Sequence, residues 1–317
     1  MKKILITRKL IDSSEKRAAK FFEVKLNKQD KLLTKDELIK ESNGCDGILA
    51  SISDKFDRDL ILKLPETIKI ISNFAVGFGN IDIEVAKKRN IIVTNTPDVL
   101  TDATAEIAML VLLGAARRAK EGIEWVNKKN WKWSADFLLG KQLSGARLGI
   151  LGMGRIGRAV ADRARSFGMK IHYYNRSRLD KNLEKDAIYH DNLQNLLSVS
   201  DFFSINCPAT KETKKIINKN SIKYFPDGAV ISNSARGDMI DDDAMVEALK
   251  SGKIFSLGLD VYNGEPNIHP EYLTLPNVYV LPHLGSSTKK TRTAMADLAV
   301  TNILNFFKNG ECENTVN

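Results

Sequence analysis

The segment Gly149-Ile150-Leu151-Gly152-Met153-Gly154-Arg155-Ile156-Gly157 follows an apolar run and opens an Ala- and Arg-rich one. Its pattern, Gly152-x-Gly154-x-x-Gly157, is typical of a strand-to-helix turn that binds a dinucleotide. The three glycines allow a tight turn, close approach of a pyrophosphate to the backbone, and close helix–strand packing, while the helix N-terminus attracts phosphate. Glycines also occur at such turns for packing alone. Here a second strand, Lys170–Tyr174, completes one compact unit, so we expect cofactor contacts from Gly152, Gly154, Arg155, Ile156 and Gly157.

Outward from this turn, short β-branched runs alternate with amphipathic helical stretches, which indicates a parallel α/β architecture. In the first hundred residues the expected strands are Lys3–Thr7, Asp46–Ala50, Ile68–Ser72 and Ile91–Thr94, and the expected helices are Ser13–Phe22, Lys35–Glu41, Asp57–Leu64 and Ile81–Lys88. A second series contains the expected strands Ala146–Leu151, Lys170–Tyr174, Asp201–Ile205, Ala229–Ser232, Ile254–Asp260 and Val278–Leu281. The pattern predicts two α/β domains in tandem.

Two longer helices are predicted at the junction and at the end of the chain. One begins at Thr101-Asp102, and the other carries Met295, Leu298, Ala299, Ile303 and Phe306 at helical spacing. Such helices suit a chain that crosses to a second domain and returns to the first. We therefore expect a discontinuous domain of residues 1–98 and 287–317, and a second domain of residues 99–286.

Composition limits the class of protein. The 317 residues suffice for two domains, and 43% hydrophobic with 27% charged residues is typical of a globular protein. No apolar run approaches the roughly 18 residues of a membrane span. The start of the chain suits a β-strand rather than a signal peptide, and three scattered cysteines suit neither a disulfide framework nor a metal cluster. We expect a cytoplasmic protein without a metal site.

The formal net charge of +9 raises the question of nucleic-acid binding. Lys and Arg are spread along the chain among 39 acidic residues, and the longest basic clusters are short. We interpret this charge as solvated surface, or as a mild field that favours anionic ligands, and expect no nucleic-acid or membrane partner.

The residues after the strand Lys170–Tyr174 bear on the choice of cofactor. An acidic residue there would accept hydrogen bonds from the NAD ribose and repel a 2′-phosphate. The chain instead has Asn175-Arg176-Ser177-Arg178, with a neutral amide, a hydroxyl and two guanidinium groups. This chemistry favours NADP(H), with NAD(H) as the alternative, although a solvated basic turn has the same composition.

Three further segments place Arg236, Glu265 and His283 just after predicted strands. They are Ser234-Ala235-Arg236-Gly237-Asp238, Gly258-Leu259-Asp260-Val261-Tyr262-Asn263-Gly264-Glu265-Pro266 and Leu281-Pro282-His283-Leu284-Gly285-Ser286-Ser287-Thr288. Open α/β sheets bind ligands at this end of their strands. Arg can bind a carboxylate and a carbonyl oxygen, a protonated His can donate a proton as hydride arrives, and a carboxylate can favour the protonated His. Singly, each residue also suits an ion pair, a satisfied histidine or a turn; together they predict reduction of a 2-oxo acid.

The chain resembles the D-isomer-specific 2-hydroxyacid dehydrogenases over nearly its whole length. The resemblance rests on Asn73-Phe74-Ala75-Val76-Gly77-Phe78-Gly79-Asn80-Ile81-Asp82, on Thr94–Glu106 and on the Arg, Glu and His segments. Asn175–Arg178 and Trp131-Lys132-Trp133 are most similar to glyoxylate/hydroxypyruvate reductases and 2-ketogluconate reductases. The resemblance implies two Rossmann-like α/β domains with parallel sheets, a flavodoxin-like substrate domain and an NAD(P)-binding domain.

The resemblance also implies residue roles. The backbone N–H groups of Val76 and Gly77 would bind the substrate carboxylate opposite Arg236, with His283 as general acid and Ser286 closing the site. Further cofactor contacts would come from Thr104, Cys207, Pro208, Thr213, Ser234, Ala235, Asp260 and Gly285. The resemblance implies a homodimer formed through the cofactor domain, with the segment around Trp131 near the partner, although a buried core role for Trp131 is an alternative.

We therefore expect an enzyme that reduces glyoxylate or hydroxypyruvate with NADPH, with 2-ketogluconate or another 2-oxo acid as the alternative substrate. A nucleotide-sensing, corepressor-like binding protein of the same fold is the non-enzymatic alternative, since fold alone does not separate the two. The chain ends soon after its last predicted helix, whereas such corepressors usually carry additional tails, and this favours the enzyme.

Overall fold

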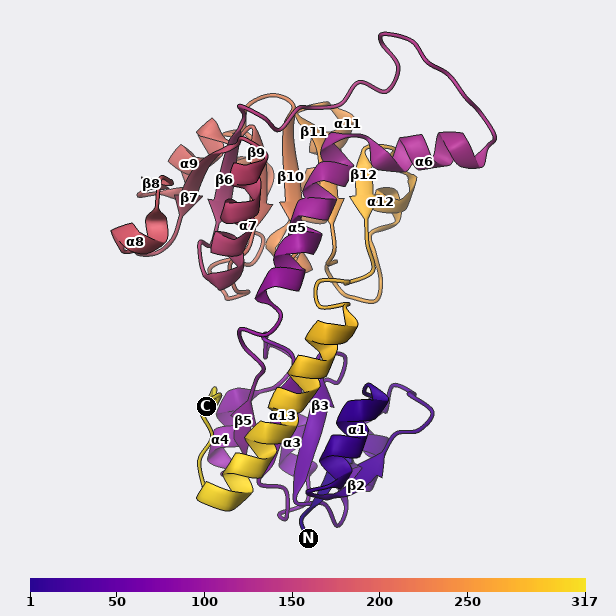
Figure 1. Ribbon diagram of the computed structural model, residues 1–317, viewed down its shortest axis with the longest axis vertical. Coiled ribbons are helices and arrows are strands. Elements are labelled where there is room, and N and C mark those ends of the chain that lie inside the picture. Colours follow the sequence, from indigo (N-terminus) through magenta and orange to yellow (C-terminus); the bar gives the residue numbers. More distant parts are fainter. The chain divides into compact units, whose positions relative to one another are not determined.

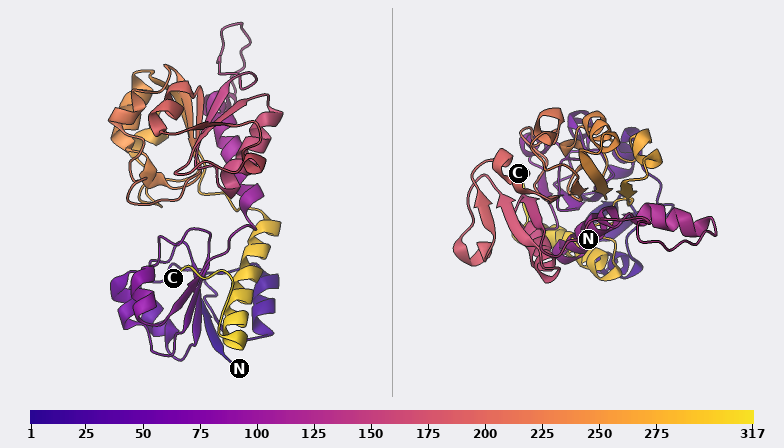
Figure 2. Two further views of the ribbon diagram at one scale, coloured as in Figure 1. Left: turned by 90° about the vertical axis from the view of Figure 1, so that its left-hand side faces the viewer. Right: turned by 90° about the horizontal axis from the view of Figure 1, so that it is seen from above.

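The computed structural model describes residues 1–317, which form two compact units (Figures 1 and 2). Unit 1 is Met1–Leu100 together with Ser286–Asn317, and unit 2 is Thr101–Gly285. The boundaries expected from the sequence were 98/99 and 286/287. No helix of either unit has the length and apolar character that a membrane span requires.

Unit 1 contains a five-stranded parallel sheet in the order β2-β1-β3-β4-β5. Its strands are β1 (Lys3–Ile6), β2 (Glu23–Leu26), β3 (Gly47–Ser51), β4 (Ile70–Phe74) and β5 (Ile92–Thr94). This is the flavodoxin-like strand order, and it confirms the predicted fold of the first domain.

Side chains alternate between the two faces of this sheet. Ile4, Ile6 and Leu49 face helices α1 (Asp12–Ala19) and α13 (Lys289–Asn309), which lie side by side in Figure 1. Their neighbours in sequence Leu5, Ile48 and Ala50 pack with the other three helices, α2 (Lys35–Ser42), α3 (Arg58–Lys63) and α4 (Ile83–Lys88). The C-terminal helix α13 thus completes the core of the unit that contains the N-terminus.

Unit 2 contains a seven-stranded parallel sheet in the order β12-β11-β10-β9-β6-β7-β8. Its strands are β6 (Arg147–Leu151), β7 (Lys170–Tyr174), β8 (Ile188–His190), β9 (Phe202–Ile205), β10 (Ala229–Asn233), β11 (Ile254–Leu259) and β12 (Val278–Val280). From β8 to β11 this is the doubly wound order of dinucleotide-binding folds, extended by β12. The predicted α/β fold with two parallel sheets is confirmed.

Helices cover both faces of the second sheet. Leu148, Ile150 and Phe202 pack with α5 (Thr101–Ala116) and α7 (Arg155–Ser166). Leu151, Phe203 and Ile205 point to the opposite face, which α9 (Leu193–Val199), α10 (Lys219–Ile222), α11 (Asp242–Lys250) and α12 (Pro270–Thr274) cover. The short elements α6 (Ala119–Asn127), α8 (Lys181–Glu184) and the 3-10 turn η1 (Gly237–Met239) complete the unit.

The strands β2 and β8 were not predicted. Both are edge strands, with the sequences Glu-Val-Lys-Leu and Ile-Tyr-His. Because an edge strand pairs on one side only and is less buried, it can consist of a short, polar sequence that lacks the continuous apolar run of a central strand.

Candidate active site

Except for Thr104, which lies on α5, the predicted cofactor and catalytic residues of unit 2 follow six neighbouring strands. They come after β7 (Asn175, Arg176, Ser177, Arg178), β6 (Gly152, Gly154, Arg155, Ile156, Gly157), β9 (Cys207, Pro208, Thr213), β10 (Ser234, Ala235, Arg236), β11 (Asp260, Glu265) and β12 (His283, Gly285). Because all these strands are parallel, their carboxyl ends meet at one edge of the sheet. Residues that are up to 133 positions apart in sequence therefore belong to one edge.

The three glycines of the turn after β6 have different surroundings. Gly152 has φ +93°, and a Cβ there would lie 2.5 Å from the backbone nitrogen of Cys207. A Cβ on Gly157 would lie 2.1 Å from the carbonyl oxygen of Gly152. At Gly154 a Cβ would meet nothing within 4 Å. The first and third glycines are required for packing, whereas the second borders open space.

The start of α7 provides a second observation about this turn. No side chain caps its N-terminus at Gly154, and its first turn has no acidic residue. The first N–H groups of a helix lack intrahelical acceptors and carry partial positive charge. Together with the open space at Gly154, this arrangement fits the pyrophosphate of a dinucleotide.

The residues after β7 are arranged around this turn. Asn175 Oδ1 accepts a 2.7 Å hydrogen bond from the Met153 N–H, so the amide fastens the end of β7 to the glycine turn. Arg176 and Ser177 are exposed. Arg178 donates from Nη2 to Glu184 Oε2 at 2.9 Å, so its guanidinium already has a carboxylate partner within unit 2.

His283 and Glu265 are in direct contact, although they follow different strands. His283 Nδ1 lies 2.7 Å from Glu265 Oε2, and Glu265 Oε1 accepts a 2.9 Å hydrogen bond from the Tyr262 N–H. Because the carboxylate occupies Nδ1, Nε2 is the nitrogen of His283 that can exchange a proton with a ligand. A histidine oriented by a carboxylate is the usual geometry of a general acid.

Charge and burial act in opposite directions at this pair. Burial alone would raise the pKa of Glu265, but the His283 hydrogen bond and charge, the Tyr262 N–H and the charge of Arg236 together hold that pKa below its ordinary value. Burial lowers the pKa of Arg236, while the charges of Glu265 and Asp238 oppose this shift. Arg236 and Glu265 are thus near enough to stabilise each other's charged form.

Residues 109–285 match the family model described as the NAD binding domain of D-isomer specific 2-hydroxyacid dehydrogenases. This match covers more than half of the chain, including the glycine turn, Arg236, Glu265 and His283. The chain belongs to the D-isomer specific 2-hydroxyacid dehydrogenase family. It is an oxidoreductase that acts on the CH–OH group of 2-hydroxy acids with a nicotinamide cofactor, which confirms the predicted enzyme class.

Relatives within the family are similar over almost the full chain. A glycerate dehydrogenase of Hyphomicrobium methylovorum is 43% identical over 94% of this chain and 94% of its own. A glyoxylate reductase of Thermococcus litoralis is 41% identical over 99% of this chain and 96% of its own. Among solved structures, the NADPH-dependent glyoxylate/hydroxypyruvate reductase of Sinorhizobium meliloti in complex with NADP and malonate has a TM-score of 0.87 at 32% identity, covering 99% and 96% of the two chains.

In this dehydrogenase, Asp260 connects the end of β11 to the segment that follows His283. Asp260 is fully buried, and its two carboxyl oxygens accept hydrogen bonds from the N–H groups of Leu284 at 2.7 Å and Gly285 at 2.8 Å. Burial raises the pKa of Asp260, while these amides and the charge of His283 oppose the shift. Thr104 Oγ1 donates to the Gly285 carbonyl oxygen at 3.2 Å. The structure therefore brings together three of the expected cofactor residues, Thr104, Asp260 and Gly285.

Asn233 was not predicted as a site residue, although it shapes the turn that carries Arg236. Asn233 is buried; its Oδ1 accepts from the Ala235 N–H at 2.9 Å and its Nδ2 donates to the Arg236 carbonyl at 2.8 Å. At the next residue, a Cβ on Gly237 would lie 1.8 Å from the Tyr262 carbonyl carbon, so the turns after β10 and β11 pack directly together. An Asn at a strand end before small residues is a turn signal that could have been recognised.

The remaining expected residues have less distinctive surroundings. Burial raises the pKa of Cys207 to about 11, so this residue is a thiol at neutral pH. Thr213 Oγ1 donates to the Pro208 carbonyl oxygen at 2.9 Å. In unit 1, the N–H groups of Val76 and Gly77 donate to no protein acceptor, while their carbonyls accept from Asn95 and Asn73. Ser286 begins the C-terminal segment of unit 1.

Proposed function

We propose that this dehydrogenase reduces glyoxylate or hydroxypyruvate, with NADPH as the preferred cofactor and NADH as the alternative. The observation that carries the proposal is the 2.7 Å contact of His283 with Glu265 at the sheet edge that also holds Arg236 and the glycine turn. The names of the Thermococcus litoralis and Sinorhizobium meliloti relatives support this substrate class, and another 2-oxo acid such as 2-ketogluconate is the alternative.

In the proposed mechanism the chain binds, orients and protonates the 2-oxo acid. Arg236 binds the carboxylate and the carbonyl oxygen of the substrate through its planar fork. His283 gives the proton on Nε2 to the carbonyl oxygen, and Glu265 orients the imidazole through its contact with Nδ1. The reduced nicotinamide, when bound, supplies the hydride that completes reduction to the 2-hydroxy acid.

A substrate panel tests this proposal and separates it from the nucleotide-sensing alternative. The purified protein is mixed with NADPH and then with NADH, each with glyoxylate, hydroxypyruvate and 2-ketogluconate, and the absorbance of the reduced cofactor is followed. We expect the highest kcat/KM with NADPH and one of the first two acids. Tight NADPH binding without turnover of any acid would instead support a nucleotide-sensing protein. A higher kcat/KM with 2-ketogluconate than with the other two acids would identify 2-ketogluconate as the substrate.

The cofactor preference is tested by Asn175→Asp combined with Arg176→Ala. Asp keeps the oxygen that accepts from the Met153 N–H while adding the charge that repels a 2′-phosphate. A charge-assisted hydrogen bond contributes on the order of 1.5–3 kcal/mol, so kcat/KM with NADPH should decline roughly ten- to a hundredfold while NADH is affected far less. A parent that prefers NADH, or a double variant with unchanged preference, contradicts the assignment.

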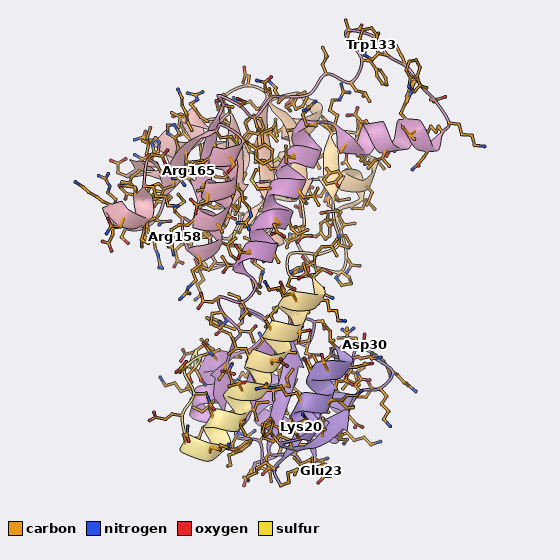
Figure 3. The ribbon with its side chains drawn as sticks, viewed as in Figure 1. Lys20, Glu23, Asp30, Trp133, Arg158 and Arg165 are labelled. Atoms are coloured by element: carbon orange, nitrogen blue, oxygen red, sulfur yellow. The ribbon has the colours of Figure 1, made fainter.

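We also propose a homodimer formed through the cofactor domain, in the cytoplasm. The segment from α6 to about residue 139 leaves large apolar side chains in solvent: Ile123, Val126, Trp131, Trp133 and Leu139. Figure 3 shows Trp133 near the tip of this segment, away from the rest of unit 2. The alternative that Trp131 belongs to the core is wrong, because 86% of its surface is exposed.

The three free cysteines agree with the proposed cytoplasmic location, because the cytoplasm is a reducing compartment.

A further inference from the structure

The turn formed by residues 175–180, here called the cofactor turn, is fastened at both of its ends. At the first end, Asn175 accepts the Met153 N–H at 2.7 Å. At the other end, the Tyr173 hydroxyl accepts the Leu179 N–H at 3.1 Å. Tyr173 is fully buried in the sheet, so it provides a rigid support. The path of the turn is therefore set by the body of unit 2.

A buried carboxylate completes the second attachment. Glu184, at the end of α8, has only 4% of its surface exposed. It accepts from the Tyr173 hydroxyl at 2.7 Å, from Arg178 Nε at 3.0 Å and from Arg178 Nη2 at 2.9 Å. The bonds from Arg178 and Tyr173 hold the pKa of Glu184 below its ordinary value. Glu184 is thus an ionised group whose positive partner is Arg178.

The geometry of Arg178 is that of an anchor. Its guanidinium makes a two-nitrogen fork with Glu184, and its carbon atom Cζ lies 5.8 Å from the ring centroid of Tyr189 on β8. If Arg178 turned toward a phosphate, Glu184 would lose its cation and the hydrogen bonds from Arg178 Nε and Nη2, which is unfavourable. The positive charge of Arg178 is therefore already balanced by Glu184.

Arg176 is in a different situation. Both arginine side chains are exposed, but Arg176 makes no hydrogen bond or ion pair with the protein. Its charge helps the Thr210 hydrogen bond to lower the pKa of Glu212 in the segment after β9. Its neighbour Ser177 is exposed as well. Arg176 and Ser177 thus provide the hydrogen-bond donors of the cofactor turn that stay available to an anionic ligand.

We propose that Glu184 and Tyr173 are positioning residues that hold Arg178 as a structural anchor, and that Arg176 with Ser177, and not Arg178, discriminates a 2′-phosphorylated adenosine. The inference rests on the proposed NADPH preference. It assigns different roles to Arg176 and Arg178, which cannot be distinguished from the sequence alone. Arg176 contacts the 2′-phosphate directly. Arg178 instead stabilises the conformation of the cofactor turn, and both NADPH and NADH bind against this turn.

Binding of adenosine 2′,5′-bisphosphate and of AMP, measured by calorimetry, distinguishes the two arginines. Arg176→Ala should weaken bisphosphate binding roughly ten- to a hundredfold, with AMP affinity and Tm unchanged. Arg178→Ala should lower Tm and weaken both ligands by the same factor, so their affinity ratio stays within about twofold of the parent. Selective loss of the bisphosphate in Arg178→Ala with unchanged Tm overturns the proposal.

A double-mutant cycle tests the role of Glu184 without any cofactor. Arg178→Ala leaves the Glu184 carboxylate without its cation, so adding Glu184→Gln should recover part of the lost Tm, whereas additive effects of the two changes contradict the anchor. Arg178→Lys, which keeps the charge but not the fork, should lower Tm less than Arg178→Ala. If the parent binds the bisphosphate no better than AMP, the NADPH preference and the role of Arg176 fail together, while this cycle still decides the role of Glu184.

Discussion

The contact between His283 Nδ1 and Glu265 Oε2 assigns a function to each atom of the pair. The carboxylate fixes the imidazole orientation and leaves Nε2 for proton transfer, and the Tyr262 N–H holds the second carboxylate oxygen. Because the pKa of Glu265 lies below its ordinary value, this carboxyl group is ionised at neutral pH and accepts both hydrogen bonds as a carboxylate.

Substitution of each partner has a distinct consequence. His283→Ala removes the general acid, so kcat should fall by about two or more orders of magnitude with cofactor affinity nearly unchanged. Glu265→Gln removes the carboxylate charge beside His283 Nδ1 and weakens the bond that orients the imidazole, so kcat should fall about tenfold or more, but less than in His283→Ala. Steady-state kinetics with glyoxylate and NADPH measure both effects, and an unchanged kcat in Glu265→Gln argues against the pair.

At Arg236, the contribution of the planar guanidinium geometry can be distinguished experimentally from the contribution of its positive charge. Its turn is held by Asn233 and its guanidinium is partly buried, so the side chain has a defined position. Lys keeps the positive charge but cannot make two parallel hydrogen bonds, so Arg236→Lys should lose much of the activity. Steady-state kcat/KM with glyoxylate is the measurement. Near-normal efficiency would show that Arg236 acts only through its charge or in packing.

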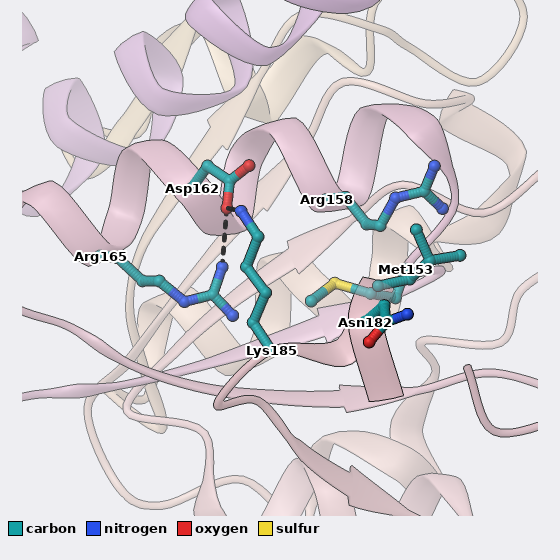
Figure 4. A pocket seen from close by; sticks show the side chains of 7 residues that line it. Met153, Arg158, Asp162, Arg165, Asn182 and Lys185 are labelled. Atoms are coloured by element: carbon teal, nitrogen blue, oxygen red, sulfur yellow. Dashed lines mark hydrogen bonds and ion pairs between the residues drawn. The ribbon is translucent and has the colours of Figure 1, made fainter. Parts of the chain in front are cut away.

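At the scale of elements, the unit β6–turn–α7 combines glycines that serve packing with one that serves the ligand. Gly152 and Gly157 lie against backbone atoms, whereas Gly154 borders open space with φ −74° and ψ −157°, which other residues also adopt. The pocket beside this turn, shown in Figure 4, lies between α7 and α8 and contains Met153, Arg158 and Lys185. Asp162 there pairs with Arg165 and Lys185, so its charge is locally balanced.

The glycines can be tested by a matched series of alanine variants. Gly154→Ala should leave Tm unchanged but weaken NADPH and NADH alike, by roughly tenfold or more, because the methyl group occupies the space of the pyrophosphate. Gly157→Ala should lower Tm, because its Cβ would lie 2.1 Å from a carbonyl oxygen. Thermal unfolding and fluorescence titration measure both effects. Unchanged affinity for both cofactors in Gly154→Ala would place the pyrophosphate elsewhere.

At the scale of the whole molecule, the exposed apolar segment after α5 predicts association. Ile123 and Val126 lie on α6, a helix without any buried residue. Replacing both by Asp should convert a dimer to a monomer in sedimentation velocity with little change in Tm, because neither side chain is buried within its own chain. Leu62→Asp, at an equally exposed apolar residue of α3, is the control. A monomeric parent contradicts the proposed dimer.

Local sequence patterns determined most elements of the fold. The strand Lys170–Tyr174 was predicted with the bounds that the structure has, and the other central strands within about two residues, because buried parallel strands need continuous apolar runs. The edge strands β2 and β8 were missed because their sequences lack such runs. The glycine turn was recognised because its backbone geometry and packing exclude larger side chains at two of its three glycines.

Tertiary structure decided which of the recognised residues act together. Parallel strand order brings Glu265 and His283 into contact, and no local pattern reveals the 2.7 Å distance between their side chains. The sequence Asn175–Arg178 presents two equivalent arginines, but only the folded chain places the buried Glu184 against one of them. The periodicity of apolar residues depends on burial and backbone conformation, which are local properties of the chain. The hydrogen-bond partner of a side chain depends on the position of residues that are distant in sequence. Only the packed tertiary structure determines that position.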